Sequence, residues 1–215
     1  AQALPTLQQA TPPAPIRSDE YALRIERARR LLHELGADAL LVNAGASLRY
    51  FAGVPWGASE RLVALLVTAN GDPAMIAPAF EEGSLDAVLK IPVHKRLWEE
   101  HENPHALVAS IMAERGARTL ALDPEAALRI HTGLTAQLGA ASVIDATAVI
   151  DGCRRCKSPA ELALMQQACD ITLQVHRLAA GIVREGIGTD ELVRFIDNAH
   201  RALGADGGST FCIVQ

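Results

Sequence analysis

The pentapeptide H-E-N-P-H, which begins at His101, contains residue types that could perform metal chemistry. His101, Glu102 and His105 match the H-E-x-x-H pattern of zinc peptidases, in which two histidines on one helical face hold the ion and the glutamate acts as a base. That pattern requires one helix across the whole stretch. Pro104 would clash inside such a helix, whereas Asn103 followed by Pro104 is typical of an N-cap and a first helical residue. We therefore expect a helix that begins at Pro104, and no zinc site at this place.

A second candidate for chemistry is the C-R-R-C stretch, which places Cys153 three residues before Cys156. A zinc site usually needs a second cysteine pair, and Cys169 and Cys212 do not form one. The two intervening arginines and the start of the next helix would favour a thiolate, so a redox pair is one interpretation. The other is two incidental thiols in a linker.

Composition excludes several classes of protein. The chain has 215 residues, of which 49% are hydrophobic and 21% charged, as in an ordinary globular protein. Twenty basic residues against 25 acidic ones give a net charge of −5, and no basic run indicates a nucleic-acid partner. No apolar stretch approaches the ~20 residues that span a membrane.

Residues 1–17 are rich in Gln, Pro and Ala, without hydrophobic periodicity, and we expect an extended N-terminal arm. The first residue is Ala and not Met. Signal-peptide cleavage would leave such an end, so export is favoured slightly over a cytoplasmic location. The alternative is a boundary chosen when the protein was prepared.

Residues 18–152 are expected to form one α/β domain, a mixed sheet with crossover helices. Amphipathic spacing predicts a helix at 19–35, capped by Ser18 and ended by Gly36. Buried strands and further helices alternate after it, and N-G-D-P at 70–73 predicts a hairpin turn. The strands are expected at 38–42, 61–67, 74–77, 119–122 and 142–144, and the helices at 46–53, 104–115 and 123–138.

Residues 153–215 differ in character and are expected to contain two helices and one strand. Ser158, Pro159 and Glu161 predict a capping box at the start of one long helix. Thr189 is expected to cap a second helix that runs to 203, and F-C-I-V at 211–214 to begin a strand. The buried stripe of the long helix is predicted from Leu162, Met165, Cys169, Thr172, Val175, Ala179 and Ile182. Two helices and a strand cannot enclose a core, so this domain is expected to be incomplete.

Three stretches resemble the creatinase, prolidase and methionine aminopeptidase superfamily, which has a "pita-bread" catalytic fold. L-R-Y-F-A-G-V-P-W-G-A-S-E-R, from Leu48, is similar to a segment of the N-terminal domain of Xaa-Pro peptidases. R-R-C-K-S-P-A-E, from Arg154, is similar to the entry into the catalytic domain. G-G-S-T-F-C-I-V, from Gly207, is similar to the first catalytic strand. The resemblance implies a creatinase-like N-terminal domain followed by the truncated start of an α+β pita-bread domain.

The same resemblance implies an activity and its cofactors. Members of this type hydrolyse the bond before proline in dipeptides or at peptide N-termini, using two divalent metal ions (Mn, Zn or Co) held by two Asp, one His and two Glu. All these ligands would lie beyond the strand expected from Phe211. Asp206 does not match a ligand position. We therefore expect no catalytic residue, metal ligand or bound metal in residues 1–215, and no activity from these residues alone.

The resemblance also suggests partners and a substrate contact. Related enzymes are often homodimers in which the N-terminal domain of one subunit reaches the active site of the other. Trp56 would cover the proline pocket and Arg61 would meet a carboxylate. A purely structural reading, with Trp56 as a packing residue and Arg61 as an edge charge, is equally open. The expected partners are therefore a proline-containing peptide, a second copy and the C-terminal portion of the same protein.

Two other functions remain open from the residues alone. One is a different reaction on the same fold, either a creatinase-type amidinohydrolase or a lyase. The other is a module that binds a partner without catalysis. Fold alone does not decide among these functions.

Overall fold

The computed structural model describes residues 11–214, apart from the side chain of Ala141. The described chain divides into two compact units, one of residues 16–156 and one of residues 11–15 with 157–214. No helix among the described residues combines the length and the apolar character needed to cross a membrane.

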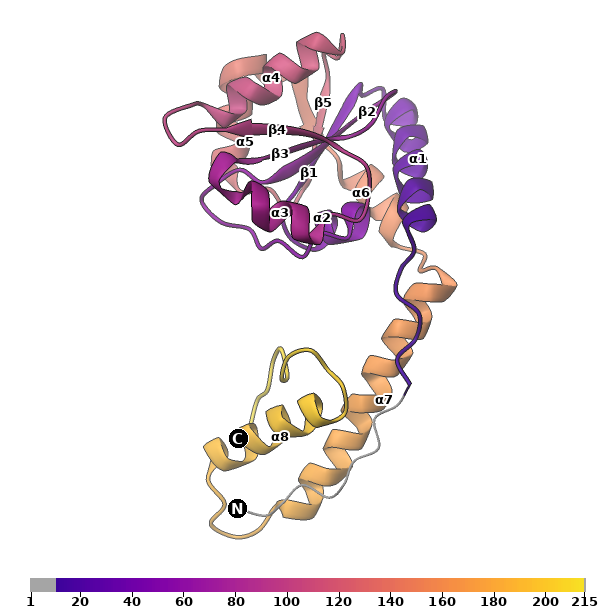
Figure 1. The fold of residues 1–215 in the computed structure, drawn as a ribbon, viewed down its shortest axis with the longest axis vertical. Helices are drawn as coiled ribbons and strands as arrows, with labels where there is room; N and C mark the ends of the chain where they lie inside the picture. The colour runs from indigo at the N-terminus through magenta and orange to yellow at the C-terminus, as the bar shows by residue number, and fades with distance from the viewer. Residues whose placement is uncertain (1–10, 215) are drawn as a thin grey trace. The chain divides into compact units, whose positions relative to one another are not determined.

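The unit of residues 16–156 is built on one six-stranded sheet with the order β4-β3-β2-β1-β5-β6 (Figure 1). β2 is antiparallel to β1 and β3, and the other neighbouring pairs are parallel. Five strands therefore run in one direction and β2 runs against them. The strands are β1 (Ala39–Asn43), β2 (Ala64–Thr68), β3 (Ala74–Pro78), β4 (His94–Trp98), β5 (Leu120–Leu122) and β6 (Val143–Asp145).

Helices cover both faces of this sheet (Figure 1). Buried residues of α1 (Ser18–Leu35), α2 (Ala46–Ala52), α3 (Glu82–Val88) and α6 (Thr147–Arg154) belong to the core on one face. Those of α4 (Pro104–Glu114) and α5 (Leu128–Leu138) belong to the core on the other face. Two short 3-10 turns, Ala79–Glu81 and Ala140–Ser142, complete the unit.

The central strands are apolar at nearly every position because both of their faces are buried. Leu40 and Val42 of β1 contribute to the core beside α1, whereas Leu41 contributes to the core beside α4. β1, β2 and β3 are buried at all five positions. Side chains alternate between the faces of a strand, so each face needs its own apolar set. The predicted mixed sheet with buried strands is confirmed.

Local signals placed several boundaries correctly. The Asn103 side chain accepts hydrogen bonds from the backbone N–H groups of His105 (3.0 Å) and Ala106 (3.4 Å), and α4 begins at Pro104. Gly36 ends α1 with a left-handed φ of 74°. Gly71, with a φ of 77°, lies in the turn between the paired strands β2 and β3.

Other predictions for this unit were wrong. Ser18 does not cap α1, because Arg17 is the N-cap and makes no side-chain cap bond. α5 begins at Leu128 and not near 123, because Asp123 uses its side chain in a turn, accepting from the Glu125 N–H at 3.0 Å. β2 begins at Ala64, three residues later than predicted. α3, β4 and α6 were not predicted from the sequence.

The compact unit continues past the expected boundary at 152. α6 ends at Arg154, and the unit ends at Cys156. α6 packs against α1, with Val149, Ile150 and Cys153 in the shared core. Residues 11–17 contain no helix or strand, and residues 1–10 of the expected arm lie outside the described residues.

The second unit contains α7 (Pro159–Ile182) and α8 (Thr189–Ala202), which pack against each other. α7 begins with the predicted capping box: the Glu161 N–H donates to the Ser158 hydroxyl (3.2 Å), and the Ser158 N–H donates to the Glu161 carboxylate (2.9 Å). Ile171 and Val175 of α7 and Ala199 and Leu203 near the end of α8 form its small core.

Three predictions for this unit were wrong. Four residues of the predicted buried stripe of α7 are exposed instead: Leu162, Met165, Cys169 and Thr172. The α7 residues that pack against α8 are Ile171 and Val175. Thr189 does not cap α8, whose N-cap is Gly188. Residues 211–214 form no strand, since no other segment of the described chain offers them a ladder of hydrogen bonds.

Candidate functional site

The carboxyl ends of β1, β3, β4, β5 and β6 meet at one edge of the sheet, because these five strands share a direction. β2 runs against them, so its first residue, Ala64, lies at the same edge, opposite Asn43. The loop of residues 53–63, which leads from α2 into β2, therefore ends there. In open α/β sheets this edge is where ligands usually bind. This loop contains both Trp56 and Arg61.

The loop is fixed at both ends. Gly53 begins it with a φ of 70°, and a Cβ there would lie 2.8 Å from the Tyr21 hydroxyl, so only glycine fits. At the other end the Trp98 indole N–H donates to the Leu62 carbonyl at 3.1 Å. Arg129 of α5 donates to the carbonyl of Ser59 in the middle of the loop. These contacts give the loop a defined path across the sheet edge.

Trp56 is half-buried and packs against the core on the α1 face. Its backbone N–H donates to the Val54 carbonyl at 3.0 Å, which forms a tight turn. The indole thus has one packed side and one accessible part. It can act as a wall for an apolar ring while it also contributes to the core.

The Arg61 guanidinium contacts three side chains that were not predicted to lie near it. Its Nε donates to Glu100 Oε1 at 2.8 Å and its Nη2 to Glu100 Oε2 at 3.3 Å. Its Nη1 donates to Glu60, and its guanidinium carbon lies 5.3 Å from the centre of the Phe80 ring. The hydrogen bond to Glu100 raises the pKa of Arg61, and the same contact lowers the pKa of Glu100. The Arg61 side chain is still 39% exposed.

Glu100 was missed because it follows β4, a strand that was not predicted, and Phe80 was missed because nothing in its local sequence indicates a contact with Arg61. Glu100 comes two residues after β4, whose His-Lys-Arg start is too polar to indicate a strand. Phe80 lies in a 3-10 turn after β3 and is 61% exposed. The charge of Glu100 was the available signal, but its distance of 39 residues from Arg61 concealed the pairing.

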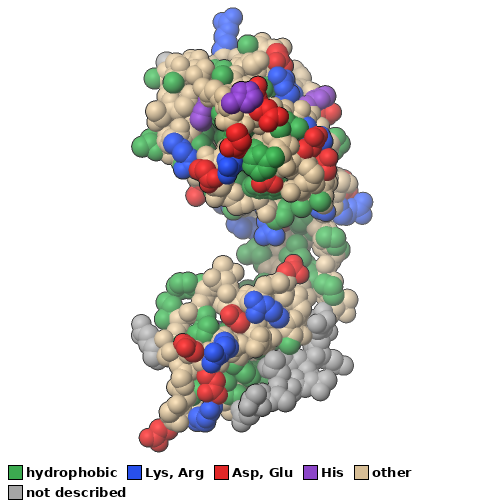
Figure 2. Space-filling view, turned by 60° about the vertical axis from the view of Figure 1, so that its left-hand side comes forward, with side chains coloured by type: hydrophobic (Ala, Val, Ile, Leu, Met, Phe, Trp, Pro, Cys, Tyr) green, Lys and Arg blue, Asp and Glu red, His purple; other side chains and the backbone are tan. Residues whose placement is uncertain are grey.

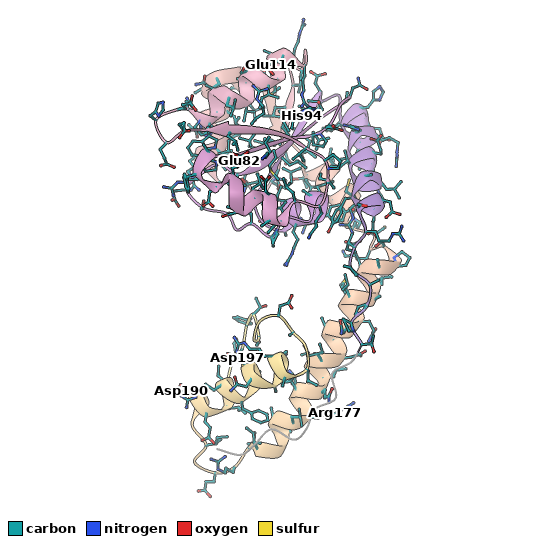
Figure 3. The ribbon with its side chains drawn as sticks, in the orientation of Figure 1. Glu82, His94, Glu114, Arg177, Asp190 and Asp197 are labelled. Atoms are coloured by element: carbon teal, nitrogen blue, oxygen red, sulfur yellow. The ribbon has the colours of Figure 1, made fainter. Side chains whose placement is uncertain are left out.

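β4 is anchored by charge on both faces of the sheet. Lys95 donates to Glu82 and Asp86 of α3, and Arg96 forms a two-pronged pair with Glu114 of α4 at 2.6 and 2.8 Å. Figure 3 shows Glu82 and Glu114 coming from helices on opposite sides of the strand. The pair with Arg96 lowers the pKa of Glu114 to about 2. These pairs hold the strand that carries Glu100 at its end.

The H-E-x-x-H stretch does not assemble a site. His101 lies in a turn before α4, and the Glu102 carboxylate accepts a hydrogen bond from the Glu99 N–H at 2.7 Å. The His105 ring packs against α5, where a Cβ at Gly133 would lie 2.5 Å from it. Among residues 11–214 no three His, Cys, Asp or Glu side chains are placed to hold a metal ion.

The C-R-R-C pair is likewise not joined. Cys153 is buried against α1 and Cys156 is exposed, and neither forms a disulfide. Burial raises the pKa of the Cys153 thiol to about 11. A thiol with so high a pKa is a poor nucleophile, so the redox interpretation has no support in this arrangement.

In the second unit, a depression between α7, α8 and the loop after α8 is bordered by His176, His200 and Asp206. His200 is nearly buried and its Nδ1 lies 2.9 Å from the Ile196 carbonyl, so it is engaged within α8. His176 and Asp206 are exposed. These three residues form no ion-holding group.

Acidic and basic side chains are interspersed over the visible face of the α/β unit (Figure 2). Each of the basic residues Arg61, Lys95 and Arg96 is paired with a carboxylate. This surface therefore offers no extended basic stripe of the kind that binds a nucleic-acid backbone.

The family model of the creatinase/prolidase N-terminal domain matches residues 24–156, nearly the whole α/β unit. The chain belongs to this family. The 53–63 loop and Glu100 are thus parts of a creatinase/prolidase N-terminal domain.

Similar proteins include peptidases and one enzyme of another kind. The agropine synthesis cyclase of Rhizobium rhizogenes is 28% identical over 79% of this chain and 46% of its own length. The crystal structure of dipeptidase PepE from Mycobacterium ulcerans is 26% identical, with a TM-score of 0.78 over 90% of this chain and 52% of that one. The prolidase of Thermococcus sibiricus is 25% identical, with a TM-score of 0.74 over 87% of this chain and 51% of that one. The chain spans about half the length of the curated relatives that it matches.

Proposed function

We propose that this chain is the N-terminal portion of a metal-dependent peptidase that hydrolyses the Xaa-Pro bond of dipeptides or of peptide N-termini. The likeness to dipeptidase PepE over 90% of the chain carries the proposal, and the likeness to a prolidase supports it. An Xaa-Pro amide is tertiary and has no N–H, so the enzyme must recognise it by ring shape and by flanking charges. A half-exposed indole and a positioned guanidinium suit that task.

In this proposal two divalent metal ions (Mn, Zn or Co) are held by residues outside this chain. The side chains of residues 11–214 do not fit such a centre, because they contain no group of three suitable ligands. The contribution of these residues is then to bind and orient the substrate. The test compares residues 1–215 with the full-length protein on an Xaa-Pro dipeptide with added Mn²⁺. Only the full-length protein should hydrolyse it; turnover by residues 1–215 would refute this division of roles.

We further propose that the protein is a homodimer in which the 53–63 loop of one subunit borders the active site of the other. Trp56 would cover the proline ring and Arg61 would contact a substrate carboxylate. This role is supported by the contacts of Arg61 with Glu100 and Phe80 at the carboxyl edge of the sheet and by the partial exposure of both side chains. The C-terminal portion of the same protein would supply the rest of the site.

Steady-state kinetics of the full-length protein test these two roles. Trp56→Ala should raise the KM for Xaa-Pro dipeptides. Trp56→Phe keeps a flat ring, so its KM should lie close to that of the wild type. Arg61→Ala should raise the KM for a dipeptide with a free carboxylate but not for its C-terminal amide. Unchanged KM values in both alanine variants would exclude the loop from substrate binding.

A second candidate is a non-peptidase reaction on the same fold. The similarity to the agropine synthesis cyclase of R. rhizogenes favours it, since that name describes no peptidase. The two candidates differ in a simple measurement. Hydrolysis of Xaa-Pro dipeptides by the metal-loaded full-length protein supports the peptidase, and failure across a dipeptide panel supports the alternative.

A further inference from the structure

Arg61 already has a carboxylate in the position that a substrate carboxylate would take. Glu100 binds the Nε and Nη2 side of the guanidinium with both of its oxygens, at 2.8 and 3.3 Å. This is the two-pronged geometry by which arginine recognises carboxylates. The Phe80 ring lies beside the same guanidinium, with its centre 5.3 Å from the guanidinium carbon.

The hydrogen-bonding capacity of Arg61 is mostly used within the chain. A guanidinium has five N–H donors. Two donate to Glu100 and one to Glu60. The described residues therefore leave one N–H on each terminal nitrogen without a partner.

Charge around Arg61 opposes a further anion. Glu60 and Glu100 both accept hydrogen bonds from the guanidinium, and the negative charge of Glu81 also acts on it. An additional carboxylate would meet net repulsion unless one of these groups moved away or lost its charge. Glu100 makes the most direct contact, and its side chain is 56% exposed and can swing into solvent.

We propose that Glu100 is a specificity-determining residue that competes with the substrate carboxylate for Arg61. Its competition weakens the hold of Arg61 on any carboxylate, and a substrate must displace it to gain the two-pronged contact. This inference rests on the role proposed above for Arg61. Because the pair is exposed, the competition is mild and corresponds to a change of a few fold in affinity.

The test is Glu100→Gln in the full-length protein. Glutamine keeps the size of the side chain and one acceptor oxygen but removes the charge. The KM for an Xaa-Pro dipeptide should fall about two- to fivefold, while kcat and the KM for the dipeptide amide stay unchanged. If Glu100 had only a structural role, its replacement would change the KM for the dipeptide and for the dipeptide amide equally. An unchanged or raised KM for the dipeptide would overturn the proposal.

Glu99→Gln is the matched control. Glu99 is the adjacent residue, is exposed and has the same charge, but no contact joins its side chain to Arg61. The KM values of Glu99→Gln should equal those of the wild type. A fall in the KM for the dipeptide as large as that of Glu100→Gln would mean that any loss of negative charge has this effect, and would refute a specific competition.

Arg61→Ala separates the two levels of the proposal. If Arg61→Ala raises the KM for the dipeptide and Glu100→Gln does not lower it, the competition is wrong and the role of Arg61 stands. If Arg61→Ala leaves the KM unchanged, the role of Arg61 is itself wrong. In the double variant, Glu100→Gln should have no further effect, because the group for which it competes is absent.

Discussion

The guanidinium carbon of Arg24 lies 4.1 Å from the centre of the Tyr50 ring, and its Nη1 donates a 2.7 Å hydrogen bond to the Tyr50 carbonyl. Its Nη2 also pairs with Glu20. The Arg24 side chain is only 7% exposed, so this charge is held between α1 and the end of α2, at the entrance to the 53–63 loop.

Replacement of Arg24 by Met should lower the free energy of unfolding by about 2–4 kcal/mol, because it removes the ion pair with Glu20 and the hydrogen bond to the Tyr50 carbonyl at a nearly buried position. Arg27→Met, at an exposed position of the same helix, should change it by less than about 0.5 kcal/mol. Both tryptophans lie in the α/β unit, so urea unfolding followed by tryptophan fluorescence reports on this unit. Equal stability of the two variants would contradict a structural role for Arg24.

Replacement by alanine should have opposite effects at two glycines, one at the close contact between α4 and α5 and one in open space on α3. A Cβ at Gly133 would lie 2.5 Å from the His105 ring, whereas a Cβ at Gly83 in α3 has nothing within 4 Å. Gly133→Ala should destabilise the protein by about 1–3 kcal/mol through overpacking. Gly83→Ala should stabilise it by about 0.4–1 kcal/mol through helix propensity and a less flexible unfolded chain. The same unfolding experiment measures both; a gain at Gly133 would show that the His105 ring moves freely.

His105 should make stability depend on pH near neutrality. Burial lowers its pKa below the ordinary value of 6.5, so below that pH the folded protein binds fewer protons than the unfolded chain. The contribution of neutral His105 to the free energy of unfolding is fully present above pH 6.5. It is lost as the pH falls through the pKa of His105 in the folded protein. His105→Gln should weaken the dependence of the unfolding free energy on pH just below pH 6.5. Carboxylates with lowered pKa values, such as Glu114, act at lower pH and leave this window unchanged.

Thiol labelling should distinguish the cysteines of C-R-R-C. Cys156 and Cys169 are exposed and should react with a maleimide within minutes in native protein. Cys153 is buried with a pKa of about 11 and should react only on unfolding. Mass spectrometry of labelled peptides with and without denaturant measures this. Rapid native labelling of Cys153 would return the redox interpretation to consideration.

Local signals were reliable where a short stretch satisfies its own backbone. Asn103-Pro104 and Ser158-Pro159 begin helices because the Asn103 and Ser158 side chains accept hydrogen bonds from N–H groups within three residues, and because proline already has a helical φ. Ser18 and Thr189 are equally good capping residues by type, yet neither caps its helix. A residue type permits a cap, but the path of the incoming chain determines whether the side chain can reach the N–H groups.

The candidate site could be predicted only in part. Trp56 and Arg61 were selected from a resemblance, and the structure places both in one anchored loop at the carboxyl edge of the sheet. Their roles in binding remain proposals. Glu100 and Phe80 could not be found, because their contacts with Arg61 depend on the position of β4 beside β3.

The sequence by itself determined the buried strands, most helix starts and the family, because apolar periodicity, caps and motifs are properties of neighbouring residues. Only the tertiary structure decided that β2 also pairs with β1, that Arg24 is buried and that Glu100 binds Arg61. These features arise when residues far apart in the chain meet across the sheet. Their energies depend on distance and burial, which no local pattern records.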